Sequence, residues 1–268
     1  MTAPRGTVYL VGAGPGAPDL LTLRAARLLE RADIVFHDAL VHPDIVALAA
    51  HAEKIAVGKR CGRHSAAQRF INKRLIDAAV RHSTVVRLKG GDPMLFGRAQ
   101  EEIDALQAAG IAVEVVPGIT AALAACADLR ISFTQRGVSR HVALVTPRVG
   151  EGMAEGEWIR TVCHADSAAV YMAAGQARAM SARLLAAGMA ADTAAMIVEN
   201  ASLPTVRSTR TTLAELPGQT AAGLGDGPAI ILLGAAFAHA PAATAHADAV
   251  AAAPAVPVAV AERLDRFA

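Results

Sequence analysis

Short apolar runs and longer amphipathic segments alternate along the first half of the chain. The apolar runs predict buried strands at residues 7–11, 34–36, 54–57, 84–88 and 113–116. Between them, apolar residues at helical spacing predict helices at residues 20–32, 43–50, 66–80 and 99–109. Regular alternation of strand and helix indicates an α/β fold with a mostly parallel sheet.

A second set of elements follows the Pro117-Gly118 turn. It comprises a helix at residues 119–129, strands at 141–146, 168–172, 194–198 and 229–233, and a helix at 176–187. We therefore expect two α/β domains with mostly parallel sheets and a cleft between them, covering residues 1–118 and 119–237. Residues 238–268 are mostly Ala, Pro and Val, and we expect a mobile tail.

Composition narrows the class of protein. Hydrophobic residues make up 53% of the chain, yet no apolar run approaches the roughly 20 residues that cross a bilayer. The first residues lack the apolar core of a signal peptide, so we expect a cytoplasmic protein without a membrane partner. A net charge of +2 gives no field that would hold nucleic acid. The three cysteines form no CxxC pair and the nine histidines are scattered, so we expect no metal site.

Basic residues gather near glycine-rich turns in the first half of the chain. The members of this basic cluster are Lys59, Arg60, Arg63, His64, Arg87, Lys89 and Arg98. Arg offers paired planar donors and Lys a point charge, so a polyanionic small molecule is a natural partner. The alternative is solvated charge on helices and loops.

Four motifs carry candidate chemistry. The turn GAGPG at residues 12–16 follows a strand and, with Ala17, fits a dinucleotide fingerprint, although Pro15 stiffens it; the alternative is a plain turn. The string RLKGGDPMLFGR at 87–98 combines close backbone approach, hydrogen-bonding groups and an apolar wall, as suits a flat ligand with a polar end. The basic loop at residues 57–65 predicts recognition of carboxylates. The alternative is a solvated connection between a strand and a helix. The turn VPGITAA at residues 116–122 would place helix amides and the Thr120 hydroxyl in the cleft between the domains. The alternative is a helix cap followed by small packing residues.

In this order and spacing, the GPG, VGKR-GRH, RLKGGDP–FGR and PGIT strings resemble uroporphyrinogen-III C-methyltransferases of the tetrapyrrole methylase superfamily. The resemblance runs over about residues 6–237 and displaces the dinucleotide interpretation. It implies S-adenosyl-L-methionine in the interdomain cleft, S-adenosyl-L-homocysteine as product, and a homodimer. It also implies two successive methylations of uroporphyrinogen III, at C-2 and C-7, which give precorrin-2 for sirohaem or cobalamin.

Site residues follow from the resemblance, position by position. The donor contacts would be Pro15, Gly90, Gly91, Asp92, Leu95, Thr120, Ala121, Met172 and Ala201. Asp38 would accept a proton and Lys59 would donate one. The carboxylates of the macrocycle would be anchored by Arg60, Arg63, His64, Arg98 and Arg136.

The chain departs from the family pattern near these positions. His37 and Ala39 flank Asp38 where Tyr and Arg are usual. The other departures are Ala99-Gln100 in place of Gly-Gly, Pro147 in place of Gly, and Ala173 and Ala201 in place of Gly. Each added methyl group, or lost amide donor, falls where backbone and ligand are expected to be close.

The sequence contains no dehydrogenase or ferrochelatase module before the methylase region, so we expect methyl transfer alone. Three alternatives stay open. One is a methyltransferase that acts on a later precorrin, another is a cofactor-binding paralogue with reduced activity, and the third is a dinucleotide-dependent oxidoreductase.

Overall fold

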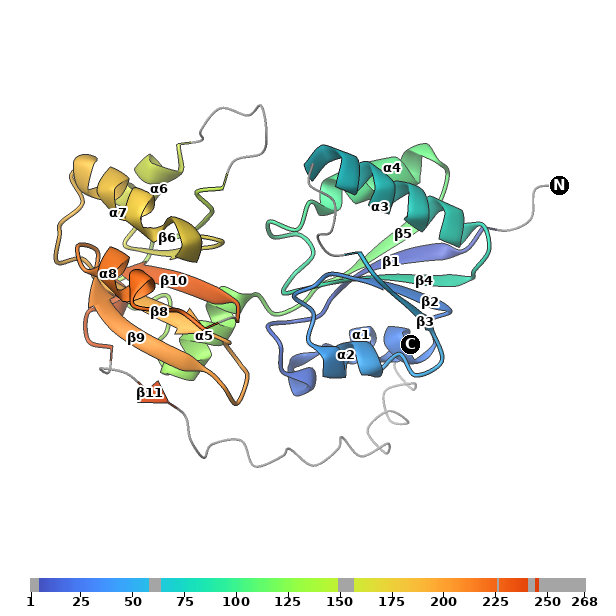
Figure 1. Ribbon diagram of the computed structural model, residues 1–268, viewed down its shortest axis with the longest axis horizontal. Helices are drawn as coiled ribbons and strands as arrows, with labels where there is room; N and C mark the ends of the chain where they lie inside the picture. The colour runs from blue at the N-terminus through green and yellow to red at the C-terminus, as the bar shows by residue number, and fades with distance from the viewer. Residues whose placement is uncertain (1–4, 58–63, 149–156, 226, 241–243, 246–268) are drawn as a thin grey trace.

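Two lobes, each built around one β-sheet, make up the computed structural model (Figure 1). The structure describes residues 5–57, 64–148, 157–225, 227–240 and 244–245. The side chains of residues 64–67 and 244–245 fall outside this description.

The first lobe is a five-stranded parallel sheet with helices on both faces (Figure 1). Its strands lie in the order β3-β2-β4-β1-β5. They are β1 (Thr7–Gly12), β2 (Ile34–His37), β3 (Glu53–Ala56), β4 (Thr84–Lys89) and β5 (Ala112–Val116). The helices are α1 (Leu23–Glu30), α2 (Pro43–Ala47), α3 (His64–Ala79) and α4 (Ala99–Ala108), with a 3₁₀ turn η1 (Pro18–Leu20).

Strand alternation gives the first sheet two apolar faces. Val86 and Leu88 of β4 pack with α1 and α2, and Val85 packs with α3 and α4. Burying one such side chain contributes about 1.5–3 kcal/mol, so both helical layers are held by the hydrophobic effect. The first predicted helix begins at Leu23 instead of residue 20, because the Thr22 hydroxyl caps α1 by accepting from the Ala25 amide.

The second lobe contains a six-stranded sheet in the order β11-β9-β8-β10-β7-β6. Its strands are β6 (Val142–Val145), β7 (Ser167–Val170), β8 (Ala194–Glu199), β9 (Arg207–Thr212), β10 (Ala229–Gly234) and β11 (Thr244–Ala245). Its helices are α5 (Ala121–Leu129), α6 (Trp158–His164), α7 (Ala177–Ala186) and α8 (Leu216–Ala221), with 3₁₀ turns η2 (Ala174–Gln176) and η3 (Ala235–Phe237). One face packs against α5, and the other against α6, α7 and α8.

The expectation of mostly parallel strands is confirmed for the first sheet and wrong for the second. Only β6 and β7 pair in parallel there, whereas β7, β10, β8, β9 and β11 pair antiparallel. The connection between β8 and β9 is too short for a parallel crossover, so the two strands form a hairpin. Strand β9 has the sequence RSTRTT, which is polar throughout, so no apolar run predicts this strand.

Parts of the predicted tail, at residues 238–240 and 244–245, contact β9. The Arg210 guanidinium donates to the carbonyl oxygens of Ala238 at 2.8 Å and Ala240 at 2.9 Å, and β11 pairs with β9. Residues 246–268 lie outside the described residues, so their mobility stays a prediction. The domain limits at residues 118 and 237 also stay predictions. No helix in the described part of the chain is long and apolar enough to cross a membrane.

Candidate functional site

Three glycine-containing loops meet at the carboxyl edge of the first sheet, beyond β4, β1 and β5. The Ala13 amide donates to the carbonyl oxygen of Lys89 at 2.7 Å, and Gly14 and Gly91 exchange two backbone hydrogen bonds of 3.1 and 2.7 Å. After β1 the chain passes to α1 on one face, and after β4 to α4 on the other (Figure 1). Open α/β sheets bind ligands outside such switch points.

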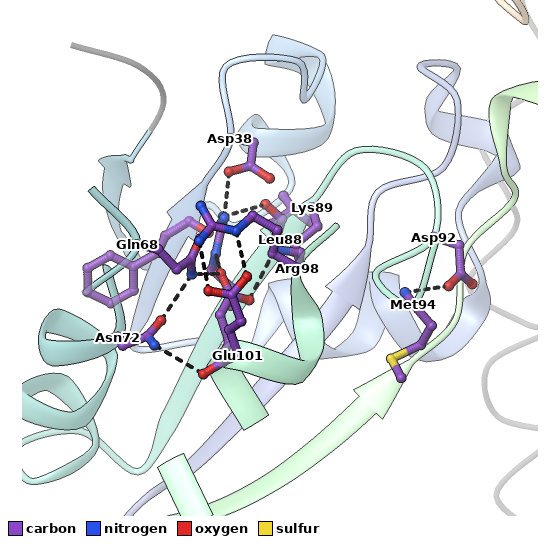
Figure 2. Close-up of polar contacts among 12 residues, drawn as sticks. Asp38, Gln68, Asn72, Leu88, Lys89, Asp92, Met94, Arg98 and Glu101 are labelled. Atoms are coloured by element: carbon purple, nitrogen blue, oxygen red, sulfur yellow. Dashed lines mark hydrogen bonds and ion pairs between the residues drawn. The ribbon is translucent and has the colours of Figure 1, made fainter. Parts of the chain in front are cut away.

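Gly118 brings the third loop into backbone contact with the other two. A Cβ at Gly118 would lie 2.9 Å from the Cα of Gly12, and closer still to the carbonyl oxygen of Gly91. The Asp92 carboxylate joins the loops, because one of its oxygens accepts from the Gly118 amide at 2.9 Å. The other oxygen accepts from the Met94 amide at 2.7 Å (Figure 2). Asp92, predicted to bind the ligand, therefore also fixes the loops that surround it.

Space remains beside Gly90 and Gly91. The nearest atom to a Cβ built at Gly90 would be the Cβ of Leu40 at 3.6 Å, and at Gly91 the Cα of Thr120 at 3.9 Å. Gly91 also has a φ of +67°, which disfavours residues with a Cβ. The absence of side chains here leaves a backbone surface that a ligand can approach.

The geometry argues against dinucleotide binding by residues 12–16. In that fingerprint the glycine turn opens directly into a helix whose amides hold the pyrophosphate. Here the turn is followed by η1, and α1 begins only at Leu23. The strand order also has β4 between β2 and β1, where a dinucleotide fold has β2 beside β1.

The amino terminus of α5 lies against a tyrosine from the turn after β7. The Tyr171 hydroxyl is 2.6 Å from Thr120 Oγ1 and accepts from the Ala122 amide at 3.3 Å. The Tyr171 ring contacts the Phe96 ring, with 5.1 Å between centroids. Predicted site residues Thr120 and Ala121 are thus held beside the loop that contains half-buried Leu95.

Two loops of the second lobe complete the arrangement. Met172 follows β7 with a left-handed φ of 56° and an exposed side chain. After β8, the Ser202 amide donates to Asp128 at 2.7 Å, and the Ser202 hydroxyl accepts from the Ala17 amide at 3.1 Å. The second contact joins the loop containing Ala201 to the turn containing Pro15, so both lobes contribute to one region.

Two of the alanines that replace family glycines, Ala173 and Ala201, place their methyl groups in hydrophobic cores. Ala173 is fully buried in the cluster beneath α7, and Ala201 is buried in the cluster beneath α5. Neither residue has a positive φ. The expectation that these methyl groups intrude between backbone and ligand is therefore not supported at either position.

A buried group of charges lies below the loops, between β4, α3 and α4. Glu102 is fully buried; its Oε1 accepts from Arg87 Nε and from Gln68 Nε2, both at 3.1 Å, and its Oε2 accepts from Lys89 Nζ at 3.0 Å. Arg87 also donates to Asp38 at 2.5 Å (Figure 2). Burial lowers the pKa of Lys89, and the neighbouring Arg87 adds to this effect. Burial alone would lower the pKa of Arg87, but the carboxylates raise it above its usual value.

This group corrects the prediction that Arg87 and Lys89 attract a polyanion from solution. Both side chains are almost completely buried and ion-paired within the protein. Successive odd positions of a strand face the same way, so these two cations both point toward the helices α3 and α4. Two cations two residues apart in an otherwise apolar strand indicate that a buried anion must face them. Glu102, on the buried side of α4, is that anion.

Asp38 occupies the loop after β2 with one third of its side chain exposed. Its amide donates to the Leu88 carbonyl oxygen at 3.3 Å, and its carboxylate is held by Arg87. The predicted proton acceptor is therefore fixed at the same edge of the sheet as Gly90 and Gly91.

Of the residues predicted to anchor the carboxylates of the macrocycle, the structure describes the side chains of two, Arg98 and Arg136. Arg98 is exposed and forms an ion pair with Glu101, with an Nε–Oε1 distance of 2.7 Å. Arg136 is exposed on a turn of the second lobe, between the bridged residues Gln135 and Ser139. Lys59, Arg60 and Arg63 lie outside the described residues, as does the side chain of His64.

A cavity of about 260 Å³ lies against β2, β3 and α3, and its charged lining residues are Arg74, Arg81, Glu53 and Asp77. None of the predicted site residues lines it. Among the residues that the structure describes, no group of three or more His, Cys, Asp or Glu side chains could hold a metal ion.

Comparison with known proteins identifies the family. Residues 7–217 match the sequence model of the protein family of tetrapyrrole (corrin/porphyrin) methylases. The chain belongs to the tetrapyrrole methylase family. "Siroheme synthase 2" of Halorhodospira halophila is 43% identical over 233 residues, which are 86% of this chain and 47% of that protein. The methylase chain thus spans about half the length of the curated relatives it matches.

Solved structures of tetrapyrrole methylases share the fold. Uroporphyrin-III C-methyl transferase from Thermus thermophilus, in complex with S-adenyl homocysteine, is 38% identical with a TM-score of 0.74, over 86% of this chain and 98% of that one. A cobalt precorrin-4 methyltransferase is 27% identical with a TM-score of 0.76, over 86% and 95%. The two-lobe α/β class expected from the sequence is confirmed.

Replacing Glu102 with Gln tests the buried charge group of this methylase. The variant keeps the shape but leaves two buried cations with less counter-charge, so we expect a loss on the order of 3 kcal/mol in the free energy of unfolding. Urea denaturation at neutral pH measures it. Asp104→Asn, on the exposed face of the same helix, should change this free energy by less than about 0.5 kcal/mol. Equal stability of the two variants would contradict the assignment.

Replacing Gly118 with Ala tests the backbone junction. Its Cβ would collide with the backbone of Gly12 and Gly91, which cannot rotate away, so we expect about 1–3 kcal/mol of destabilisation. Gly218→Ala is the matched control, because a Cβ there meets open space inside α8 and should be neutral or stabilising. Thermal unfolding of both variants measures the difference, and a Gly118→Ala protein as stable as the parent would refute the close contact.

Proposed function

We propose that this chain transfers methyl groups from S-adenosyl-L-methionine to C-2 and C-7 of uroporphyrinogen III, giving precorrin-2. The observation that carries the proposal is the 38% identity to the Thermus thermophilus uroporphyrin-III C-methyl transferase over 98% of its length. The 43% identity to a siroheme synthase favours sirohaem as the end product, with cobalamin as the other outcome. The cytoplasmic location stays a prediction from the sequence.

The donor site proposed here is made from the loops that meet beyond the first sheet. Its residues are Pro15, Gly90, Gly91, Asp92, Leu95, Thr120, Ala121, Met172 and Ala201. Support comes from the space beside the two glycines, which an added Cβ would narrow, and from the nearby amino terminus of α5. Helix amides and exposed backbone groups are suited to the carboxylate and hydroxyl groups of the donor. Ala201 lies in this region through its backbone, because its methyl group points into the core.

The donor supplies an electrophilic methyl group on a positively charged sulfur. The protein has to align a ring carbon with it and to remove a proton from the macrocycle, and alignment can lower such barriers strongly. Asp38 is the proposed proton acceptor: it is partly exposed at the carboxyl edge, and Arg87 fixes its direction. Lys59 is the proposed proton donor, on resemblance alone.

The macrocycle carries carboxylates that need cationic partners. We keep Arg60, Arg63, His64, Arg98 and Arg136 as the anchoring residues. The exposed apolar side chains of Met94 and Phe96, in the loop after β4, support a flat apolar ligand body beside Arg98. Arg87 and Lys89, which belong to the basic cluster, are not among them, because both are buried and paired with Glu102.

One other function has a specific observation in its favour. The likeness to a cobalt precorrin-4 methyltransferase is compatible with a later precorrin as substrate. The lower identity, 27% against 38%, makes this the second candidate. Incubation with each tetrapyrrole in turn separates the two, and donor binding without transfer to any of them would indicate a paralogue that only binds the cofactor.

Mass spectrometry of products tests the reaction. With uroporphyrinogen III and S-adenosyl-L-methionine, the parent should add one and then two methyl groups. Asp38→Asn should lower kcat by about 10²-fold or more, because a positioned general base contributes on that scale, while calorimetric affinity for S-adenosyl-L-homocysteine stays unchanged. Absence of any mass gain in the parent would refute the substrate, and a fully active Asp38→Asn enzyme would refute only the proton-acceptor role.

We propose, from the family resemblance, that the chain forms a homodimer. The edge strand β6 supports an interface there, because Val142 and Leu144 are apolar, exposed and on the face opposite the buried Ala143 and Val145. Such residues on an edge strand favour association.

Light scattering after size-exclusion chromatography tests this interface. The parent should have twice the mass of the chain, and Val142→Asp with Leu144→Asp should give mainly monomer, because two buried charges would be unpaired. Val80→Asp, at an apolar position of the first lobe that is more exposed than either of these residues, is the control. A parent that is monomeric at micromolar concentration would contradict the proposal.

A further inference from the structure

We propose that Tyr171 is a positioning residue of the donor site, which joins the loop after β4 to the amino terminus of α5 and so sets the spacing of the two lobes around the donor. This inference rests on the proposed donor site. Three segments meet at this tyrosine, which follows β7 of the second sheet. They are the Phe96 loop of the first lobe, Thr120 at the start of α5, and Met172, its own neighbour.

The hydroxyl of Tyr171 completes the start of α5. The first amides of a helix lack partners within the helix, and a capping side chain normally supplies one. Thr120, at the cap position, makes no such bond to its own helix. Tyr171 accepts from the Ala122 amide instead, while its hydroxyl and that of Thr120 share a 2.6 Å hydrogen bond. Burial raises the pKa of Tyr171, so the neutral hydroxyl keeps the hydrogen that this pair of contacts uses.

The ring of Tyr171 provides the contact between lobes. Its centroid is 5.1 Å from that of Phe96, with an angle of 54° between the rings, which is a favourable tilted geometry for an aromatic pair. Phe96 and Met172 both have left-handed φ angles, of 54° and 56°. Residues with a Cβ stay in that conformation only where their surroundings hold them there. The ring pair is such a restraint on both loops.

The position of Tyr171 predicts an effect on donor binding more than on folding. Leu95 is next to Phe96, Met172 is next to Tyr171, and Thr120 is bonded to its hydroxyl, so three proposed donor contacts each lie within one residue of this junction. Loss of the hydroxyl frees the start of α5 while the apolar ring stays packed. Sites of this kind lose affinity when a supporting contact becomes loose by as little as 1 Å.

The primary experiment compares Tyr171→Phe with Tyr9→Phe by calorimetry with S-adenosyl-L-homocysteine. The chain has two tyrosines, and Tyr9 on β1 packs in the first core, so it is the matched control. We expect Tyr171→Phe to bind about three- to tenfold more weakly, the factor that one net hydrogen bond supports, and Tyr9→Phe to bind as the parent does. The melting temperatures of unliganded parent and Tyr171→Phe should differ by little, which separates positioning from a general loss of structure.

A double-mutant cycle tests the ring contact. Phe96→Leu and Tyr171→Leu should each weaken binding, and the double variant should bind about as the weaker single one does, because both remove the same pair. Multiplicative losses would overturn the contact between lobes. Should Tyr171→Leu fail to fold, Phe96→Leu decides, because binding equal to that of the parent would overturn the ring contact.

The outcomes separate the inference from the function on which it rests. Binding by Tyr171→Phe equal to that of the parent would overturn the inference and leave the donor site intact. A parent that binds S-adenosyl-L-homocysteine but methylates no tetrapyrrole would refute the substrate and leave the inference intact. A parent without measurable binding would refute both.

Discussion

Backbone contact among three loops is the constraint on which the rest of this structure depends. Parallel pairing of β1 with β4 and β5 brings their carboxyl ends together, and Gly12, Gly91 and Gly118 let the following loops touch without side chains between them. Because Asp92 uses both carboxylate oxygens on amides within this junction, the loops keep one relative position. The proposed donor site depends on this fixed edge of the sheet, which brings together the accessible glycine backbone, the start of α5 and the partly exposed Asp38.

Beneath the loops, charge serves to position side chains. Glu102 pairs with both Arg87 and Lys89 out of contact with water, and the Nη2 nitrogen of the Arg87 guanidinium reaches Asp38. Removing ionised groups from water is costly, so such a group persists only when every charge has a close partner. A polyanionic substrate must therefore be held by other cations, on the loops and on the surface, while the buried ones orient a single carboxylate.

The sequence predicts most strands of this fold but only part of the site. Apolar runs such as those of β4 and β10 identify buried strands directly, whereas β9 is polar throughout and α8 contains Pro217 and Gly218, so neither has a periodic signal. The motifs single out Gly90 to Asp92, and the structure places these residues beside the other loops. They do not show that Arg87 is buried, nor that Tyr171 reaches Thr120, because both facts depend on contacts between residues distant in the sequence.

The contact between Ala17 and Ser202 has a consequence for how the protein is made. Residues from both lobes are needed before the loops around Pro15 and Ala201 can close, so a nascent chain lacks this contact until residue 202 has left the ribosome. Parallel strands that are far apart in sequence also pair slowly. A ligand that binds only the finished fold stabilises only that state. Cellular supply of the methyl donor would then favour completed molecules over chains still being synthesised.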